Sequence, residues 1–212
     1  MNKATDASYE SWNLGELKME NSTSQKRGLP FILASVVLWA LIAGIQLTAL
    51  SISQKNMGTF CCSVLLMPLA CLFAKIIKAD LFANKKNPIN KLGFLCTMNQ
   101  MLYILIVMWA FSENPGRMVM LFAMIFAAHL LPFAWIYEAR AYAVLSVAGT
   151  VLALLTGLLF GNAAVGILMA VLEAILSVCL LLKNRGLSKS RAAKIVKDRD
   201  FAENKTEKTV TI

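Results

Sequence analysis

Hydrophobic residues in this chain gather into six long blocks, separated by short polar segments. Each block is about 20 residues long, the length that a helix needs to cross a hydrocarbon core of about 30 Å. The blocks lack the polar face that a helix of a soluble protein presents to water. The pattern therefore predicts an all-α, polytopic membrane protein. The six predicted transmembrane helices cover residues 29–51, 57–77, 92–111, 117–137, 141–160 and 162–182.

Local signals support several of these boundaries. Pro30 suits the first turn of a helix, because its missing N–H would have no partner there. Asn114-Pro115-Gly116 is a turn signature between the third and fourth blocks. Asn162 can cap the sixth helix, since its side chain can accept from free backbone N–H groups.

Polar segments flank the six blocks on both sides. Residues 1–28 form a polar N-terminal tail, for which a disordered segment and a short helix at the membrane interface are the two alternatives. Residues 183–212 form a basic C-terminal tail that could lie on anionic lipid. The stretch before the first block is too long and too acidic for the n-region of a signal peptide, so we expect that block to stay in the membrane.

The positive charges fall on one side of the predicted helices. Nineteen of the 21 Lys and Arg residues lie in the two tails, around the second loop and at Arg140, whereas Lys55 and Arg117 lie on the other side. Cytoplasmic loops of membrane proteins carry such an excess. We therefore predict that both termini are cytoplasmic. Because the charges lie between the blocks and not along one face, we expect no nucleic-acid partner.

The composition also bears on metals and cofactors. All five cysteines lie inside apolar blocks without a CxxC pair, and the chain has a single histidine. A Cys/His zinc site of the usual spacing is therefore excluded. We predict no cofactor and no metal site, and we interpret the thiols as small core residues.

Polar side chains inside hydrocarbon are the candidate functional residues, because each costs free energy to place there. At about 1.5 Å per residue, Glu173 lies about 15 Å from the cytoplasmic boundary. We expect the other candidates to share this half of the membrane: His129, Asn99, Gln100 and Thr150. Together with Glu173 they would form one polar layer contributed by four helices.

Helix 162–182 indicates how Glu173 is oriented. Gly166, Ala170, Glu173 and Ser177 fall on one face at helical spacing, and large aliphatic residues fall on the opposite face. Small residues favour close helix packing and large aliphatic residues suit lipid. We therefore expect Glu173 to point into the bundle.

The roles of these polar residues stay open. Glu173 is either a proton-binding or cation-binding group in a transport path or a protonated acid that hydrogen-bonds between helices. Pro132 frees the carbonyl group of Ala128, so a kink could open a pocket beside His129. The alternative is a neutral His129 that donates to a facing helix. Asn99 and Gln100 are typical of hydrogen bonds between helices.

Small residues recur at every fourth position of helix 141–160: Gly149, Ala153, Gly157 and Gly161. Such a stripe lets two backbones approach closely. We expect it to pack inside the bundle, with dimerisation as the alternative, and the oligomeric state stays open.

Several segments resemble an uncharacterised family of bacterial multi-pass membrane proteins. They are Arg27-Gly28-Leu29-Pro30-Phe31, the Asn87-Pro88 loop before Lys91-Leu92-Gly93, the stretch from Ala128 to Tyr137, and Ala141-Tyr142-Ala143-Val144. The resemblance covers about residues 26–185. It implies six helices in a bacterial plasma membrane, and no particular activity.

Three classes of function remain. A small solute or ion transporter or channel is favoured by the polar layer around Glu173 and His129. A non-catalytic accessory, regulatory or stress-response component fits equally well. A membrane-embedded enzyme fits least, because such chemistry needs clustered carboxylates, a nucleophile with a base, or a metal site.

Overall fold

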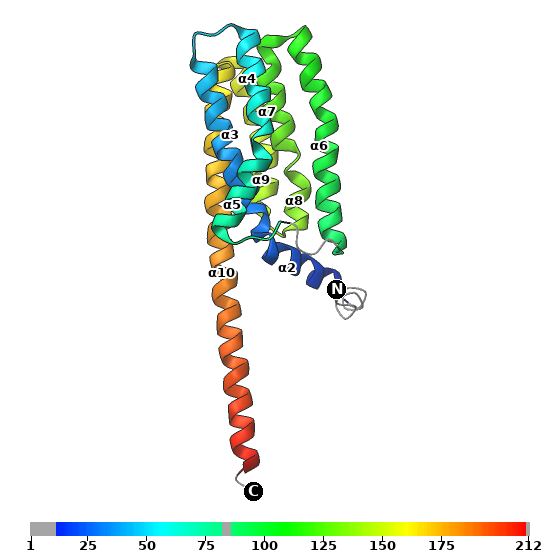
Figure 1. Cartoon of the computed structure of the whole chain (residues 1–212), viewed down its shortest axis with the longest axis vertical. Helices are drawn as coiled ribbons and strands as arrows, with labels where there is room; N and C mark the ends of the chain where they lie inside the picture. The colour runs from blue at the N-terminus through cyan, green and yellow to red at the C-terminus, as the bar shows by residue number, and fades with distance from the viewer. Residues whose placement is uncertain (1–11, 82–85, 211–212) are drawn as a thin grey trace.

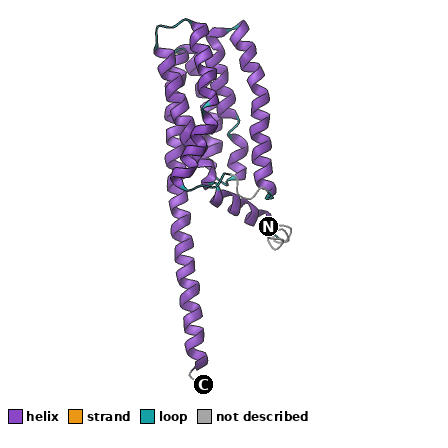
Figure 2. Cartoon of the chain, in the orientation of Figure 1, coloured by secondary structure: helices purple, strands orange, loops and turns teal. Residues whose placement is uncertain are grey.

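The computed structural model describes the backbone of residues 12–81 and 86–210, and side chains as far as residue 186. All regular secondary structure in these ranges is helical (Figure 2). Six spans are long and apolar enough to cross a membrane: Lys26–Leu47, Ile52–Ile77, Pro88–Glu113, Pro115–Ile136, Arg140–Leu159 and Asn162–Gly186. The predicted all-α, six-span architecture is confirmed at this level, and the chain is a multi-pass membrane protein.

The helices run alternately up and down through one bundle (Figure 1). Their order is α2 (Leu14–Ser24), η2 (Lys26–Gly28), α3 (Leu29–Leu47), α4 (Ile52–Val64), α5 (Leu66–Ile77), α6 (Pro88–Glu113), η3 (Pro115–Arg117), α7 (Met118–Ala128), α8 (Leu131–Ile136), α9 (Arg140–Leu159) and α10 (Asn162–Val210). α2 and the long extension of α10 lie at the same end of the bundle (Figure 1). We call this the basic end, because among the described residues only Lys55 and Arg117 carry positive charge at the opposite end.

Two spans are interrupted next to a proline. α4 gives way to α5 at Leu65, three residues before Pro68, and α7 gives way to α8 just before Pro132. A proline cannot donate to the carbonyl group four residues earlier. The Oγ of Ser146 on α9 donates to the Ala128 carbonyl oxygen at 3.2 Å, which satisfies the group that Pro132 leaves free.

α3 and α10 pack closely over most of their length. A Cβ added at Gly166 would lie 2.9 Å from the Cα of Ala43, so only a hydrogen atom fits at this crossing. One turn before Ala43 on α3, the fully buried Trp39 packs against Phe122 and Phe126 of α7, with ring centroids 5.4 and 5.5 Å apart. α3 therefore lies in the middle of the bundle.

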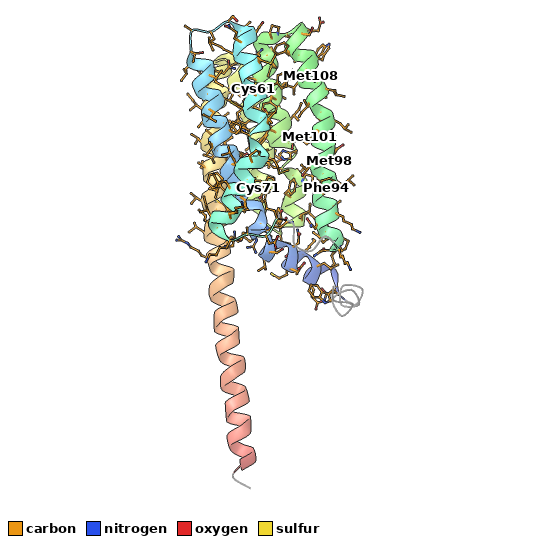
Figure 3. The ribbon with its side chains drawn as sticks, viewed as in Figure 1. Cys61, Cys71, Phe94, Met98, Met101 and Met108 are labelled. Atoms are coloured by element: carbon orange, nitrogen blue, oxygen red, sulfur yellow. The ribbon has the colours of Figure 1, made fainter. Side chains whose placement is uncertain are left out.

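Large apolar side chains cover the outer surface, as lipid contact requires. Phe94 and Met108 of α6 are 65% and 55% exposed and project from the bundle (Figure 3). On α10, Val171 and Val178 are exposed, whereas Glu173 is buried. The predicted orientation of this helix is confirmed.

Capping residues shift the helix boundaries away from the predicted ones. α3 ends at Leu47, four residues before the predicted end, and α4 begins at Ile52, five residues before the predicted start. The cause is a capping box, in which Ser51 and Gln54 satisfy each other's backbone N–H groups. α10 continues without a break to Val210, so residues 183–210 of the predicted tail are helical.

The N-terminal segment is more ordered than a disordered tail. Residues 14–24 form α2, which begins at a capping box between Asn13 and Glu16. Leu17 and Asn21 of this helix are buried against the bundle. The disordered alternative is therefore wrong for these residues, and residues 1–11 of the predicted tail lie outside the described ranges.

Two expectations at the junction of α9 and α10 are corrected. Gly161 has a left-handed backbone with φ +82°, and nothing lies within 4 Å of a Cβ added there. It ends α9 and does not pack against another helix, whereas Gly149, Ala153 and Gly157 are buried. Asn162 does not form the predicted cap, because its Oδ1 atom has no hydrogen-bond partner.

Candidate functional site

Glu173 lies on α10 with 2% of its surface exposed, and its partner is Ser35 of α3. The Ser35 Oγ atom lies 2.8 Å from Oε2 of Glu173 and 2.8 Å from the Ile32 carbonyl oxygen. A hydroxyl group has one proton to donate. Both contacts are satisfied when Ser35 donates to Ile32 and a protonated Glu173 donates to Ser35.

The surroundings of the Glu173 carboxyl group bear on its protonation state. Within the part of the chain that the structure describes, no Lys, Arg or His forms an ion pair with this carboxyl group. An unpaired ionised carboxylate is costly in a low-dielectric surrounding. The geometry therefore fits the neutral acid that the sequence offered as one alternative.

Glu173 belongs to a line of polar residues on one face of α10. Asn162, Glu173, Ser177 and Asn184 follow one another at spacings of 11, 4 and 7 residues, which returns to the same side of a helix. At about 1.5 Å per residue this line is about 33 Å long. It thus runs the length of the membrane-spanning part of α10.

α3 presents a matching line with Ser35, Trp39 and Gln46, all buried. Three polar atoms on these two helices are buried without a hydrogen-bond partner: Trp39 Nε1, Asn162 Oδ1 and Ser177 Oγ. Buried polar atoms in proteins are nearly always paired, and ordered water is a common partner where protein offers none. These three atoms mark places along the α3–α10 contact where water could be accommodated.

The structure does not assemble the other predicted candidates around Glu173. His129 ends α7, donates from Nδ1 to the Phe126 carbonyl oxygen, and lies between the rings of Phe126 and Phe133. Its hydrogen bond is therefore made within its own segment and not to a facing helix, which was one of the two alternatives from the sequence. No contact between His129 and Glu173 is found among the described residues.

The amide and hydroxyl candidates are likewise dispersed. Asn99 is exposed on α6 and donates to Tyr103 of the same helix. Gln100 is buried on α6, and Thr150 donates to the Ser146 carbonyl oxygen of its own helix at 2.7 Å. Depth along the membrane normal was predicted from the sequence, but the direction in which each side chain points was not. A single polar layer therefore does not form.

A polar network at the basic end was not predicted. Arg27 is 3% exposed, and its Nη1 donates to Oδ1 of Asn184 at 2.8 Å. The Tyr142 hydroxyl donates to the Arg27 carbonyl oxygen at 2.6 Å, and Asn184 donates to the Lys26 carbonyl oxygen at 2.9 Å. Tyr142 belongs to the same buried cluster as Leu176, which lies three residues after Glu173 on α10, so this network lies close to the intramembrane acid.

α2 and η2 join this network to the other helices; we call residues 14–28 the collar. Asn87, before α6, donates to the Leu17 carbonyl oxygen and to Glu20. Gln25 donates to Asn90 at 2.8 Å and accepts from the Tyr137 hydroxyl at 2.6 Å. Burial raises the pKa of the Tyr137 phenol above its ordinary value, so the hydroxyl keeps the proton that it donates.

The collar crosses into α3 through an unusual backbone. Lys26, Arg27 and Gly28 are three successive residues with positive φ. A Cβ added at Gly28 would lie 3.0 Å from the Tyr137 ring and 3.1 Å from the Tyr142 hydroxyl. Two separate features therefore favour glycine at this position. The backbone is left-handed, and the two tyrosine side chains leave no space for a Cβ atom.

A cavity of about 310 Å³ opens at the opposite end of the bundle. Its lining residues are Gln46, Ile52, Lys55, Phe160, Asn162 and Ala163. Gln46 and Asn162 also belong to the polar lines of α3 and α10. The two lines therefore connect this cavity, at one end, with the Arg27 network at the other.

Comparison with known proteins gives a family without an assigned activity. A family of unknown function, DUF7010, matches residues 14–183. The match includes the collar, whereas the resemblance noted in the sequence began at about residue 26. No curated protein and no solved structure matches the chain.

Proposed function

We propose that this protein is a small proton-coupled transporter or channel with Glu173 as its proton-binding residue. The chain belongs to the DUF7010 family of unknown function. The observation that carries the proposal is a lone carboxyl group, buried at membrane depth, within a line of polar atoms that reaches both ends of one helix pair. Ionisable residues inside membranes are rare and mark proton and ion pathways.

The polar lines suggest a path. From the basic end it would pass the Arg27 network and Ser177 to Glu173 and Ser35, and then Trp39 to the cavity at the opposite end. Water beside the unpartnered atoms Ser177 Oγ and Trp39 Nε1 would complete the hydrogen-bonded chain. The tight crossing of Gly166 over Ala43 lies between Glu173 and the cavity and would act as the barrier that opens during transport.

The first prediction is a proton flux that depends on Glu173. In liposomes holding a trapped pH-sensitive dye, a potassium diffusion potential should drive protein-dependent acidification. Glu173→Gln should abolish this flux, because an amide cannot release a proton. The variant should still fold, since Gln has the size and hydrogen-bonding capacity of the protonated acid.

Ser63→Ala is the matched control for the flux measurement. Ser63 Oγ donates only within its own helix, to the Thr59 carbonyl oxygen at 2.9 Å. We expect its flux to equal that of the parent protein. Equal flux from the parent and from Glu173→Gln would rule out Glu173 as the proton-binding residue. No flux from the parent would count against a proton channel, because a coupled transporter moves protons only with its solute.

A second candidate function is a non-catalytic membrane component. It is favoured by the close packing of α3 against α10 at Gly166, which leaves no open passage through the centre in this conformation. In that case Glu173 would be a structural acid, and Glu173→Gln would leave every cellular phenotype unchanged. An enzyme is not supported, because His129 and Glu173 do not converge on one cleft.

We further propose that the protein resides in a bacterial plasma membrane with both termini cytoplasmic and with anionic lipid near the basic end. The support is the distribution of charge, nineteen Lys and Arg residues on one side against two on the other.

The second prediction tests this topology. A fluorescent protein fused after Arg185 should fold and fluoresce, because it stays in the cytoplasm. Alkaline phosphatase inserted after Leu50, in the loop between α3 and α4, or after Asn114 should be active, because it is exported. An active phosphatase after Arg185 would reverse the proposed orientation.

A further inference from the structure

We propose that the cavity at the opposite end of the bundle binds a small organic carboxylate through Lys55. The cavity is formed by residues from α3, α4, the junction after α9 and the start of α10. Nothing in the proton path requires a cavity of about 310 Å³, which lies at the lower end of the size range of small-molecule sites.

The polar groups of the cavity favour an anion. The Lys55 ammonium group donates to the Gln46 carbonyl oxygen at 3.0 Å, which leaves two further protons on Nζ for a ligand. No acidic side chain occurs among the lining residues that the structure describes. An ammonium group is therefore available at the cavity without a competing carboxylate.

The start of α10 adds to this preference. Asn162 and Ala163, the first two residues of the helix, both line the cavity. The first N–H groups of a helix have no partner within it, and the helix dipole is positive there. The carboxamide of Asn162 makes no cap for these groups, because its Oδ1 atom has no partner. The Asn162 and Ala163 N–H groups thus lack a cap from this side chain, and in this proposal they donate to the anionic ligand.

The remaining walls determine the body of the ligand. Ile52, Phe160 and Ala163 are the apolar residues of the lining. A carboxylate with a short aliphatic or aromatic body would pair its charge with Lys55 and place its carbon atoms against these walls. A highly polar anion such as free phosphate would leave them wetted.

The third prediction concerns binding of small carboxylates, measured by isothermal titration calorimetry in an uncharged maltoside detergent. Valerate and benzoate are the probes. Valeramide and benzamide, which have similar shapes but no charge, are the controls. The carboxylates should bind and the amides should not. Lys55→Gln should weaken carboxylate binding by about tenfold or more, because it removes a charge-assisted hydrogen bond. Lys55→Arg should retain binding, which separates lost recognition from lost folding.

Two control variants sharpen this test. Arg117→Gln removes the other described cation at this end, whose guanidinium donates to the Gly157 carbonyl oxygen outside the cavity, and it should bind like the parent. Glu173→Gln should also bind like the parent, so that this inference and the proposed proton site fail separately. Unchanged binding in Lys55→Gln, equal binding of the amides, or binding of phosphatidylglycerol but of neither carboxylate would each overturn the proposal.

Discussion

Gly166→Leu should abolish folded protein, and Gly166→Ala should already lower the melting temperature clearly. A Cβ at this position would lie 2.9 Å from the Cα and 3.0 Å from the backbone nitrogen of Ala43. Backbone atoms in the middle of a helix cannot move aside as a flexible side chain can, so α3 and α10 would have to separate. Overpacking of this kind costs about 1–3 kcal/mol for small additions and more for a large side chain. The measurements are monodisperse yield and thermal unfolding in detergent.

Gly44→Ala is the matched control on the partner helix. Nothing lies within 4 Å of a Cβ added at Gly44, so this variant should unfold at the temperature of the parent or slightly above it. Gly157→Ala should also lower the melting temperature, because the added Cβ would lie 2.4 Å from Cγ and 2.7 Å from Cβ of Met120, and that Cβ is attached directly to the backbone of α7. Equal stability of Gly166→Ala and Gly44→Ala would mean that the two helices do not approach as closely as described.

The pattern of hydrophobic blocks was sufficient to predict the spans but not their ends. Length and mean hydropathy decide whether a helix can cross a membrane. Its first and last residues depend on local caps, such as the Ser51–Gln54 box that begins α4. Gly161 shows the same limit, because a fourth-residue repeat cannot distinguish a packing glycine from the left-handed residue that ends a helix.

The candidate site was predicted in part. Glu173 is buried on the face that the spacing of small residues indicated, and its partner Ser35 was not predicted. A serine in an apolar block carries no signal of its own, because its hydroxyl can always bond within the helix. His129 illustrates the opposite case. Its depth suggested a shared layer with Glu173, but the rotation of α7 and the break before Pro132 place it among phenylalanine rings.

The basic-end network was missed for a physical reason. α2 has no continuous apolar face, and it is held by polar contacts such as those of Asn87 and Gln25 with partners far away in the chain. Such pairings cannot be read from periodicity. Two signals were present, however: the Asn13–Glu16 capping spacing and the left-handed Gly28 just before Pro30.

Segments that carried the family resemblance meet in this network. Arg27, Gly28, Tyr137 and Tyr142 come from three of those segments and are in mutual contact at the basic end. Asn87, from the fourth, binds the collar. In this chain, the residues that carried the resemblance therefore close the basic end of the bundle.

Glu173→Lys should fail to assemble, whereas Glu173→Gln should fold like the parent. The carboxyl group is 2% exposed and has one polar partner, Ser35. A lysine there would place an unpaired ammonium group among apolar side chains, and the cost of an uncompensated buried charge is several kcal/mol. A glutamine keeps the size of the protonated acid and can donate to the Ser35 Oγ atom. Yield and monodispersity of the three proteins in detergent are the measurement.

Infrared difference spectroscopy tests whether Glu173 is protonated, which is the reason for expecting these two outcomes. A protonated carboxyl band should be present at neutral pH in the parent and absent in Glu173→Gln. Ser35→Ala should keep the band but shift its frequency, because the carboxyl O–H of Glu173 loses its acceptor. The contacts around Ser35 fit the protonated state, because a protonated Glu173 can donate to the Ser35 Oγ atom while Ser35 donates to the Ile32 carbonyl oxygen. A band that appears only at acidic pH would show an ionised Glu173 in the resting protein. Water or a cation would then have to reach the Glu173 carboxylate. The assignment of Glu173 as a neutral acid would then be wrong.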